Sequence, residues 1–404
     1  MQGKQALEGI RIIAFSWIAT LPLATQFLAY HGAEVIKVEC HRRPDETRGG
    51  APFKDNIPGI NRSGLFDICN NGKYGITLNL NHPQGPEYAK KLISTADVVA
   101  ESFTPGTMKR WGLNYEELKQ VKSDIIAVSL SMHGQDGPYS SLPILGTYLQ
   151  GAMGFTNFVG WPDREPTGTQ IPYPDTVAPW FLIVAIIAAL LYRRQTGEGQ
   201  YIDLSQFESS IPFLAPALMD YAVNGREQTR MGNKSYTAPH GVFRCKGEDR
   251  WCAIAVTNDE EWKAFCRVIN ADWQNDPKFS TLIERKKNED ELERLIEAWT
   301  INHTTEEIMK LMQDEGVPAG IVQSNRDLLE NDPQLQHRHH FHKLNHTEIG
   351  EYNCELPPFK LSETPAEVTL ASPCIGEHNE YVWTKIAGLS DKEFVELLEL
   401  GVLE

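Results

Sequence analysis

Short apolar runs alternate with amphipathic stretches along the first half of the chain. Runs of about four to eight mostly apolar residues predict strands, and apolar residues that recur every three or four positions predict helices. The predicted strands cover residues 11–16, 33–39, 76–81, 98–103 and 125–132, and the predicted helices cover residues 21–30, 83–95 and 115–121. Because strands and helices alternate, the pattern predicts an open, mostly parallel, Rossmann-like α/β sheet with helices on both faces.

The most apolar stretch runs from Val177 to Tyr192. Its sixteen residues are fewer than the roughly 20 that a membrane span needs, so it predicts a buried core helix and no membrane contact. Asp175 precedes it at the position of a helix N-cap, where free amides and the helix dipole favour an ionised carboxylate. Such a carboxylate can act as a nucleophile towards an acyl carbonyl, although capping alone would also explain Asp175.

The second half of the chain predicts a smaller α+β domain. After a strand at residues 201–205 and an apolar helix to residue 223, we expect strands between residues 240 and 256 and helices at residues 260–269, 288–298 and 305–315. The predicted organisation is a large α/β domain of residues 1–205 completed by residues 376–404, a linker of residues 206–231, a small domain of residues 232–322 and a return linker of residues 323–375. Four histidines within residues 337–342 indicate an extended segment and not a metal site, because no cysteine pair or acidic triad accompanies them.

Composition restricts the function further. The 404-residue chain carries a net charge of −16, which argues against binding to nucleic acids or anionic membranes, so an anionic ligand would need a local basic patch. Seven cysteines without a Cys-x-x-Cys spacing indicate free thiols in a reducing cytoplasm, and the polar residues 1–9 predict no export signal. A cytoplasmic protein is therefore expected.

Two loops near the ends of predicted strands carry basic side chains. One loop, residues 70–73, ends with Lys73, and the other, residues 101–110, includes Phe103, Lys109 and Arg110. Ligands of open α/β sheets bind at the carboxyl ends of the strands, so both loops are candidates for an anion site. A dinucleotide is not the expected ligand, because no Gly-x-Gly-x-x-Gly follows the first strand.

Several ordered motifs resemble one enzyme family over nearly the full chain. Asp175 before an apolar helix, followed by Arg-x-x-Thr-Gly-x-Gly-Gln-x-x-Asp-x-Ser at residues 193–205, resembles the class III CoA-transferases. Formyl-CoA transferase and crotonobetainyl-CoA:carnitine CoA-transferase belong to that family. Further matching segments are residues 7–11, 32–39, 101–106, with Ser102 in place of an asparagine, and 374–378. The resemblance implies a ring-shaped subunit built from a large and a small domain, with two rings interlocked in a dimer.

The resemblance also implies a mechanism and a set of site residues. Asp175 matches the nucleophile that attacks an acyl-CoA and becomes an aspartyl-CoA thioester before CoA passes to a carboxylic acid, without a metal. Lys73, Phe103, Lys109 and Arg110 match positions that contact coenzyme A. A further basic contact of the family falls at Cys40, and Arg42 is expected to replace it.

Substrate and assembly stay open at this point. Succinyl-CoA is a candidate donor, and an aromatic acid such as benzylsuccinate is a candidate acceptor, because aromatic residues flank the site in sequence: Phe155, Phe158, Trp161, Trp180 and Phe181. Where the family has a Tyr-Asp pair before Gln150, this chain has Leu145-Gly146, which disfavours the alternative of an α-methylacyl-CoA racemase because leucine cannot carry a proton. A second alternative is the CoA-binding subunit of a hetero-oligomer in place of a homodimer.

Overall fold

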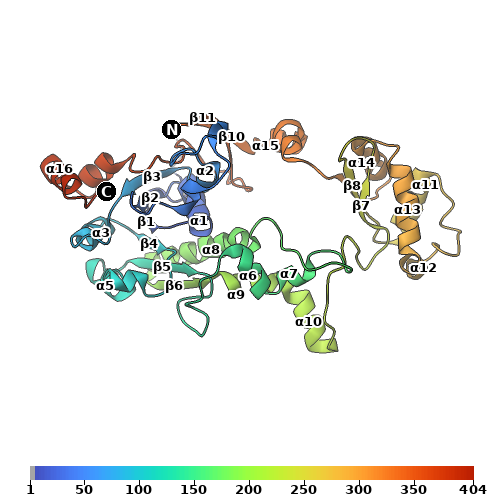
Figure 1. Ribbon diagram of the computed structural model, residues 1–404, viewed down its shortest axis with the longest axis horizontal. Helices are drawn as coiled ribbons and strands as arrows, with labels where there is room; N and C mark the ends of the chain where they lie inside the picture. Colours follow the sequence, from blue (N-terminus) through green and yellow to red (C-terminus); the bar gives the residue numbers. More distant parts are fainter. Residues whose placement is uncertain (1–4) are drawn as a thin grey trace. The chain divides into compact units, whose positions relative to one another are not determined.

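The computed structural model describes residues 5–404 and contains two compact units (Figure 1). The larger unit comprises the chain up to Gly154, Thr169–Val223 and Gln334–Glu404, and the smaller unit comprises Phe155–Gly168 and Asn224–Pro333. Residues 206–223, which we predicted as linker, pack within the larger unit. The other predicted domain boundaries stay predictions.

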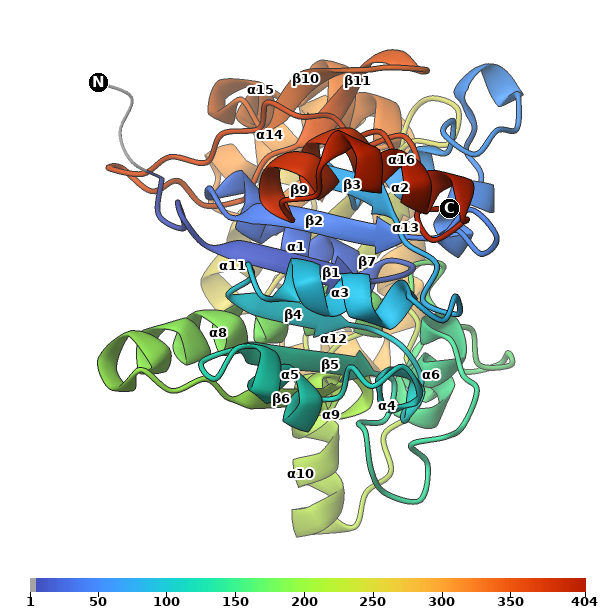
Figure 2. The ribbon, with the colours of Figure 1, turned by 90° about the vertical axis from the view of Figure 1, so that its left-hand side faces the viewer.

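The larger unit is built on a six-stranded sheet in which every neighbouring pair of strands is parallel. Its strands are β1 (Arg11–Phe15), β2 (Glu34–Glu39), β3 (Lys73–Thr77), β4 (Val98–Glu101), β5 (Ile126–Ser131) and β6 (Tyr201–Ser205). They lie in the order β3-β2-β1-β4-β5-β6, which Figure 2 shows from top to bottom. The predicted open, mostly parallel, Rossmann-like sheet is confirmed. Between β1 and β4 the strand order reverses direction, and such a switch point is where open α/β sheets bind ligands.

Each central strand buries both of its faces, because apolar residues occupy successive positions. In β1, Ile13 and Phe15 face one side, and Ile12 and Ala14 face the other. The first side packs against α3 (Gly85–Ile93), α5 (Tyr115–Val121) and α16 (Asp391–Glu399), which lie in front of the sheet in Figure 2. The second side packs against α1 (Thr20–Tyr30) and α8 (Tyr173–Thr196). The two cores fix the strand ends from which the site loops emerge.

Helix α8 is longer than predicted and begins before Asp175. It spans 24 residues, its N-cap is Pro172, and Gly197 ends it in the left-handed conformation with φ 77°. By length and composition it could cross a membrane, but Leu182, Ile186 and Ala189 are completely buried in the core beside the sheet. The prediction of a core helix therefore fits, whereas the predicted N-cap at Asp175 is wrong: Asp175 lies in the first turn of the helix.

Short elements complete the larger unit. Its remaining α-helices are α2 (Gly64–Asp67), α4 (Thr107–Arg110), α6 (Gly146–Ala152), α9 (Gln206–Ser210), α10 (Ala215–Asn224) and α15 (Pro333–Arg338). The other short helices are η1 (Glu46–Gly49), η2 (Lys54–Asn56), η3 (Ile211–Leu214) and η5 (Tyr381–Ile386), and a hairpin pairs β10 (Phe341–His346) with β11 (Gly350–Glu355). The histidine-rich segment is therefore only partly extended, because its first residues belong to α15.

The smaller unit is an α+β assembly. An antiparallel sheet contains β7 (His240–Arg244), β8 (Trp251–Ala255) and β9 (Ala319–Ile321). The helices of this unit are α7 (Phe155–Phe158), α11 (Asp259–Ile269), α12 (Leu282–Lys287), α13 (Glu289–Thr300), α14 (Thr305–Asp314) and η4 (Asp327–Asn331). Trp262, Phe265 and Ile296 are among the buried residues of its separate apolar core.

Candidate active site

Asp175 is a buried carboxylate in the first turn of α8. Its side chain leaves the residue only 7% exposed, and its Oδ1 accepts a hydrogen bond from the Thr20 hydroxyl at 3.0 Å. Burial raises the pKa of Asp175 to about 6, and the Thr20 hydrogen bond opposes that rise. We expected free amides to hold this carboxylate in its ionised form. The structure corrects that expectation, because a hydroxyl from α1 takes the place of a capping interaction.

The helix is also weakened at this point. Pro179 lies inside α8 and has no N–H, so the backbone carbonyl of Asp175 lacks its partner four residues further on. A proline in the first turn would cost little, because the N–H groups there have no partner within the helix, but Pro179 lies beyond that turn. The backbone carbonyl of Asp175 therefore lies outside the regular hydrogen bonding of the helix, and its side chain is bonded to Thr20.

Gly146 lies directly against the Asp175 carboxylate. A Cβ atom on residue 146 would stand 2.5 Å from Asp175 Oδ2 and 2.7 Å from its Cγ, closer than real contacts allow. The departure from the family pattern at Leu145-Gly146 is thus a neighbour of the proposed nucleophile. Sequence reasoning noted the departure but not its contact with Asp175. Gly146 also offers no side chain that could carry a proton, which argues against the racemase alternative.

A polar pocket of about 640 Å³ opens at the carboxyl ends of β1 to β4, where the strand order switches. We call it the switch-point pocket. Its lining includes Trp17, Cys40, Arg42, Arg43, Asn81, Ser102, Phe103, Arg110 and Trp111. The volume suits a sizeable ligand, since binding sites for small molecules typically enclose about 300–1,000 Å³. Arg42, Phe103 and Arg110 therefore line one pocket, and their contact with CoA stays a prediction.

An aromatic cluster forms one wall of the switch-point pocket. Phe103 makes edge-to-face contacts with Trp17 and Trp111, each with ring centroids 5.5 Å apart. The Arg43 guanidinium lies over the Trp17 ring at 4.6 Å. The Phe103 amide donates to Glu101 Oε2 at 2.7 Å, and burial raises the pKa of Glu101 to about 7. These contacts fix the loop after β4.

The two predicted arginines have different surroundings. Arg110 Nη2 donates to the Thr107 hydroxyl at 2.9 Å, within the short helix α4. Arg42 donates to Glu404 with Nη2 at 2.8 Å and Nε at 3.1 Å. Arg110 is thus paired with a neutral group and keeps its full charge towards the pocket, whereas Arg42 has a carboxylate partner.

Lys109 and Lys73 lie elsewhere. Lys109 lines a separate pocket of about 310 Å³ beside β4 and β5. Lys73 is 0% exposed, and its ammonium donates to Pro22 O at 2.7 Å, Cys69 O at 2.8 Å and Asn70 Oδ1 at 3.0 Å. Burial lowers the pKa of Lys73 well below its ordinary value.

The reason for the Lys73 error is the register of β3. We predicted this strand at residues 76–81, with Lys73 in a loop, but β3 is residues 73–77 and begins with Lys73. Lys73 therefore sits at the amino end of its strand, away from the carboxyl edge where ligands bind. With no exposed atom, its ammonium is inaccessible to a phosphate, so the predicted contact with CoA phosphates is corrected.

One loop connects the switch-point pocket with Asp175. The Trp17 amide donates to the Ser102 hydroxyl at 3.0 Å, and the Ile18 amide donates to Asp45 Oδ1 at 3.0 Å. Ile18 has φ 63°, an unusual conformation for a β-branched residue. Trp17 lines the pocket and Thr20, three residues later, binds Asp175, so their Cα atoms are at most about 11 Å apart.

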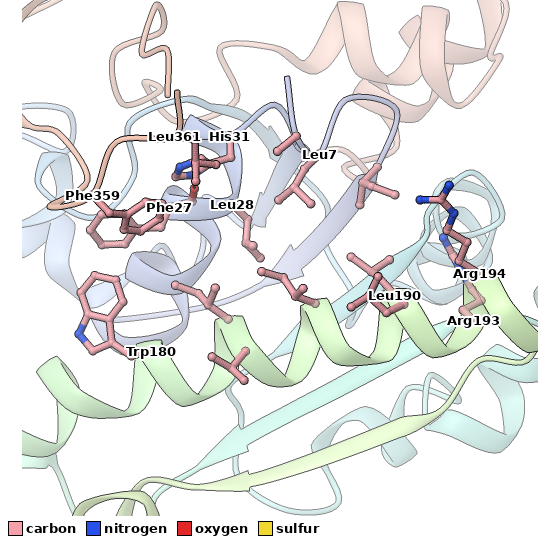
Figure 3. Close-up of a pocket in the computed structure, with 16 residues that line it drawn as sticks. Leu7, Phe27, Leu28, His31, Trp180, Leu190, Arg193, Arg194, Phe359 and Leu361 are labelled. Atoms are coloured by element: carbon pink, nitrogen blue, oxygen red, sulfur yellow. The ribbon is translucent and has the colours of Figure 1, made fainter. Parts of the chain in front are cut away.

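A second cavity is almost wholly apolar. It has a volume of about 830 Å³ and lies between α1, α8 and residues 359–361 (Figure 3). Trp180 packs against Phe27 here, with ring centroids 4.8 Å apart. We call this cavity the apolar groove. Trp180 was one of the aromatic residues expected near an acceptor acid, but its side chain lines this groove.

Residues 5–404 contain no group of three histidine, cysteine or acidic side chains that could hold a metal ion. The site that remains is a Rossmann-like switch point with an arginine-bearing pocket, reached by the same loop that holds a buried carboxylate. Such an arrangement suits an anionic ligand, such as a phosphate, bound by the arginines within reach of a carboxylate.

Comparison with known proteins identifies the family. The sequence profile of CoA-transferase family III matches residues 7–379, and the chain belongs to this family. It is 30% identical to the succinyl-CoA–D-citramalate CoA-transferase of Chloroflexus aurantiacus, over 97% of this chain and 96% of that protein. It is 31% identical to the succinate–glutarate CoA-transferase of Agrobacterium fabrum, over 95% and 96% of the two chains.

A solved structure shares the fold. The crystal structure of a CAIB/BAIF family protein from Brucella suis matches with a TM-score of 0.86 and 30% identity, over 95% of this chain and 100% of that one. The class III CoA-transferase expected from the sequence motifs is therefore confirmed. The protein is an enzyme that acts on acyl-CoA and carboxylic acid substrates.

Proposed function

We propose that the enzyme transfers CoA from succinyl-CoA to a second carboxylic acid through covalent intermediates on Asp175. The observation that carries the proposal is the state of this carboxylate: it is buried, is held by one hydroxyl, and has a pKa of about 6. At neutral pH it is ionised but poorly solvated, which makes it a better nucleophile than a carboxylate in water.

The steps conserve atoms and charge. An Asp175 oxygen attacks the thioester carbonyl carbon, the C–S bond breaks, and CoA leaves as a thiolate, which produces a mixed anhydride. The thiolate attacks Asp175 Cγ and releases succinate, which leaves an aspartyl-CoA thioester. The acceptor carboxylate then attacks Cγ, and the released thiolate attacks the acceptor's acyl carbon. The product acyl-CoA leaves and the Asp175 carboxylate is regenerated, with no net change in water, protons or electrons.

Coenzyme A is proposed to occupy the switch-point pocket. Arg110 and Arg42 would bind its phosphate oxygens, since a guanidinium forks onto phosphate, and the Phe103 cluster offers an aromatic surface for the adenine ring. The succinyl donor follows the names of the two relatives, which both act with succinate or its thioester. For the acceptor we propose a dicarboxylic acid, a class that includes benzylsuccinate.

The apolar groove supports a proposal about assembly. Val184, Ile187 and Leu191 on the outer side of α8 are exposed in the single chain. Exposure of these apolar side chains to water is unfavourable. We propose that a second copy of the chain covers them in an interlocked cytoplasmic homodimer. Light scattering at low micromolar concentration should then give about twice the 45.5 kDa chain mass. A monomer that transfers CoA would contradict it, and activity only with an unlike chain would support the hetero-oligomer.

The central test is covalent trapping. Incubation with succinyl-CoA and no acceptor should add the mass of CoA to the peptide that contains Asp175, and Asp175→Asn should show neither adduct nor turnover. Initial rates with citramalate, glutarate and benzylsuccinate as acceptors should follow a double-displacement pattern. Retained turnover in Asp175→Asn would contradict the nucleophile, and transfer to none of these acids would contradict the acceptor class.

A further inference from the structure

Asp175 is the end of a buried chain of hydrogen bonds between side chains. Gln206 Nε2 donates to Thr20 Oγ1 at 3.1 Å, and Thr20 Oγ1 donates to Asp175 Oδ1 at 3.0 Å. Thr20 is 4% exposed and Gln206 is 3% exposed. The three residues come from α1, α8 and α9, so tertiary packing and not local sequence brings them together.

The direction of this chain follows from the donors available. A hydroxyl has one proton, and when its oxygen accepts from the Gln206 amide, that proton is free to point at the carboxylate. The opposite amide orientation would place Gln206 Oε1 against Thr20 and draw the proton away from Asp175. In the described part of the chain Oε1 is buried without a hydrogen-bond partner, so Gln206 gives up one interaction to keep its donor on Thr20.

We propose that Thr20 is a catalytic residue that donates to the oxyanion formed on Asp175, and that Gln206 is the positioning residue that aims its hydroxyl. The inference rests on the proposed function, since it concerns intermediates on Asp175. When CoA thiolate attacks Cγ of the anhydride, the electron pair of the carbonyl moves onto Oδ1 as the new S–C bond forms. Thr20 already stands 3.0 Å from that oxygen, the distance required of an oxyanion donor.

Gly146 leaves open space beside the carboxylate. Oδ1 is held by Thr20, so Oδ2 is the oxygen left to attack the thioester, and the bare Cα of Gly146 lies against the whole carboxylate. A methyl group there would stand 2.5 Å from Oδ2 and occupy the space that the acyl carbon must enter. The Thr20 hydrogen bond therefore distinguishes the two oxygens of Asp175, with Oδ1 as the site of the oxyanion and Oδ2 as the attacking atom.

The Thr20 hydroxyl also opposes the effect of burial on Asp175. Ionisable side chains on the elements packed against α8 are Tyr30, Tyr148, Tyr201, Asp203 and Glu208, and the Cys69 thiol senses the charge of Asp175. Two effects set the pKa of Asp175: burial raises it, and the Thr20 hydrogen bond lowers it. Loss of that hydroxyl should therefore move the acid limb of the rate profile to higher pH.

The experiment compares variants of Thr20 with a matched threonine on the same helix. Thr20→Val keeps the buried volume but removes the donor, and kcat should fall about 100-fold with KM changed by less than about threefold. Thr20→Ser keeps the donor and should restore most of kcat and the normal acid limb. Thr25→Val is the control, because Thr25 is also buried on α1 but donates only to Leu21 O and Pro22 O, and its kcat should stay unchanged.

Two further variants keep the test independent of whether Thr20→Val folds. Gln206→Met leaves Thr20 in place but removes the amide that orients its hydroxyl. The hydroxyl should then donate less often to Asp175, and kcat should fall about 10-fold. Gly146→Ala should prevent the CoA adduct and lower the melting temperature, because its methyl group would displace the buried Asp175 carboxylate, whereas Gly151→Ala on the exposed side of α6 should keep the adduct.

The inference would be overturned if Thr20→Val kept kcat and the acid limb of the wild type. It would equally be overturned if Thr20→Ser lost as much activity as Thr20→Val, because the side chain would then act through packing alone. In both cases an Asp175→Asn variant without activity would still support Asp175 as the nucleophile. Failure of the oxyanion role and failure of the covalent mechanism are therefore separate results.

Discussion

The guanidinium of Arg42 is held at the rim of the switch-point pocket by the Glu404 carboxylate, 2.8 Å from Nη2. The Arg42 side chain is 69% exposed and that of Glu404 is 41% exposed, and a solvent-accessible ion pair contributes less than about 1 kcal/mol. A phosphate can therefore replace this carboxylate at little cost. The contact explains how Arg42 can serve as a CoA ligand although it has a partner in the free enzyme.

Removal of the competing carboxylate should strengthen CoA binding. In Glu404→Gln the Arg42 side chain keeps its charge but loses its ionic partner, so the KM for acyl-CoA should fall by about two- to threefold. Glu399→Gln, on an exposed face of α16, is a charge-matched control. An equal change of KM in both variants would attribute the effect to net charge and not to release of Arg42.

Arg110 and Lys109 are neighbours in sequence but line different pockets, so they offer a paired test. Arg110→Ala should raise the KM for acyl-CoA about 10-fold, because a charge-assisted contact with phosphate is lost. Lys109→Ala should raise it less than about threefold, because its side chain lines the other pocket. Initial-rate kinetics and calorimetric titration with CoA measure both. The reverse order would place CoA in the smaller pocket.

Lys73 should matter for stability and not for binding. Lys73→Met removes one donor from Pro22 O, Cys69 O and Asn70 Oδ1, of which Pro22 O keeps the Thr25 hydroxyl, and this should cost roughly 2 kcal/mol of unfolding free energy in urea titrations. The KM of the folded variant should equal that of the wild type. A raised KM with unchanged stability would instead restore the role in CoA binding that the sequence suggested.

Much of the sheet could be predicted, because its strands are marked by the sequence itself. Apolar residues recur along β2 and β5, and both strands were therefore predicted to within one or two residues of their bounds. The start of β3 was missed because Lys73-Tyr74-Gly75 has no apolar run. The sequence alone does not distinguish a lysine whose ammonium donates to three buried acceptors from a lysine on the surface.

The candidate site was only half visible in the sequence. Asp175 was found from its place at an apolar helix and from the family resemblance, Arg110 from its loop, and Arg42 from the resemblance alone, as the replacement for a basic contact at Cys40. The partners that define its chemistry carry no local signal: Thr20 is 155 residues away and was expected to lie just before a helix. Gly146 was marked only by its departure from the family pattern. Long-range packing supplies these contacts.

We expect the apolar groove to lie in the interface between two copies of the chain. Val184 is 67% exposed on α8, so Val184→Lys should place a charge in the proposed interface and shift the protein to a 45.5 kDa monomer in light scattering. Val395→Lys is the control, since Val395 is 51% exposed on α16, outside the groove. Assembly that survives Val184→Lys would show that the second copy does not cover this face.

Asp175→Asn should abolish CoA transfer and at the same time stabilise the protein above pH 6. Burial raises the pKa of Asp175 from 3.8 to about 6 in the folded state, so the folded protein binds this proton more tightly than the unfolded chain does. The resulting stability is fully present below about pH 4 and is lost as the pH rises through 6, a loss on the order of 3 kcal/mol. Asparagine stays neutral, still offers an oxygen to Thr20, and has no such loss.

The difference in melting temperature between Asp175→Asn and the wild type should therefore widen from pH 4 to pH 7.5. Asp163→Asn, at an exposed position, should give a small difference that does not widen. If the Asp175→Asn difference were constant across this range, the carboxylate would titrate alike in the folded and unfolded chains. A nucleophile activated by poor solvation would then be excluded, because a carboxylate whose burial costs no free energy is no more reactive than a carboxylate in water.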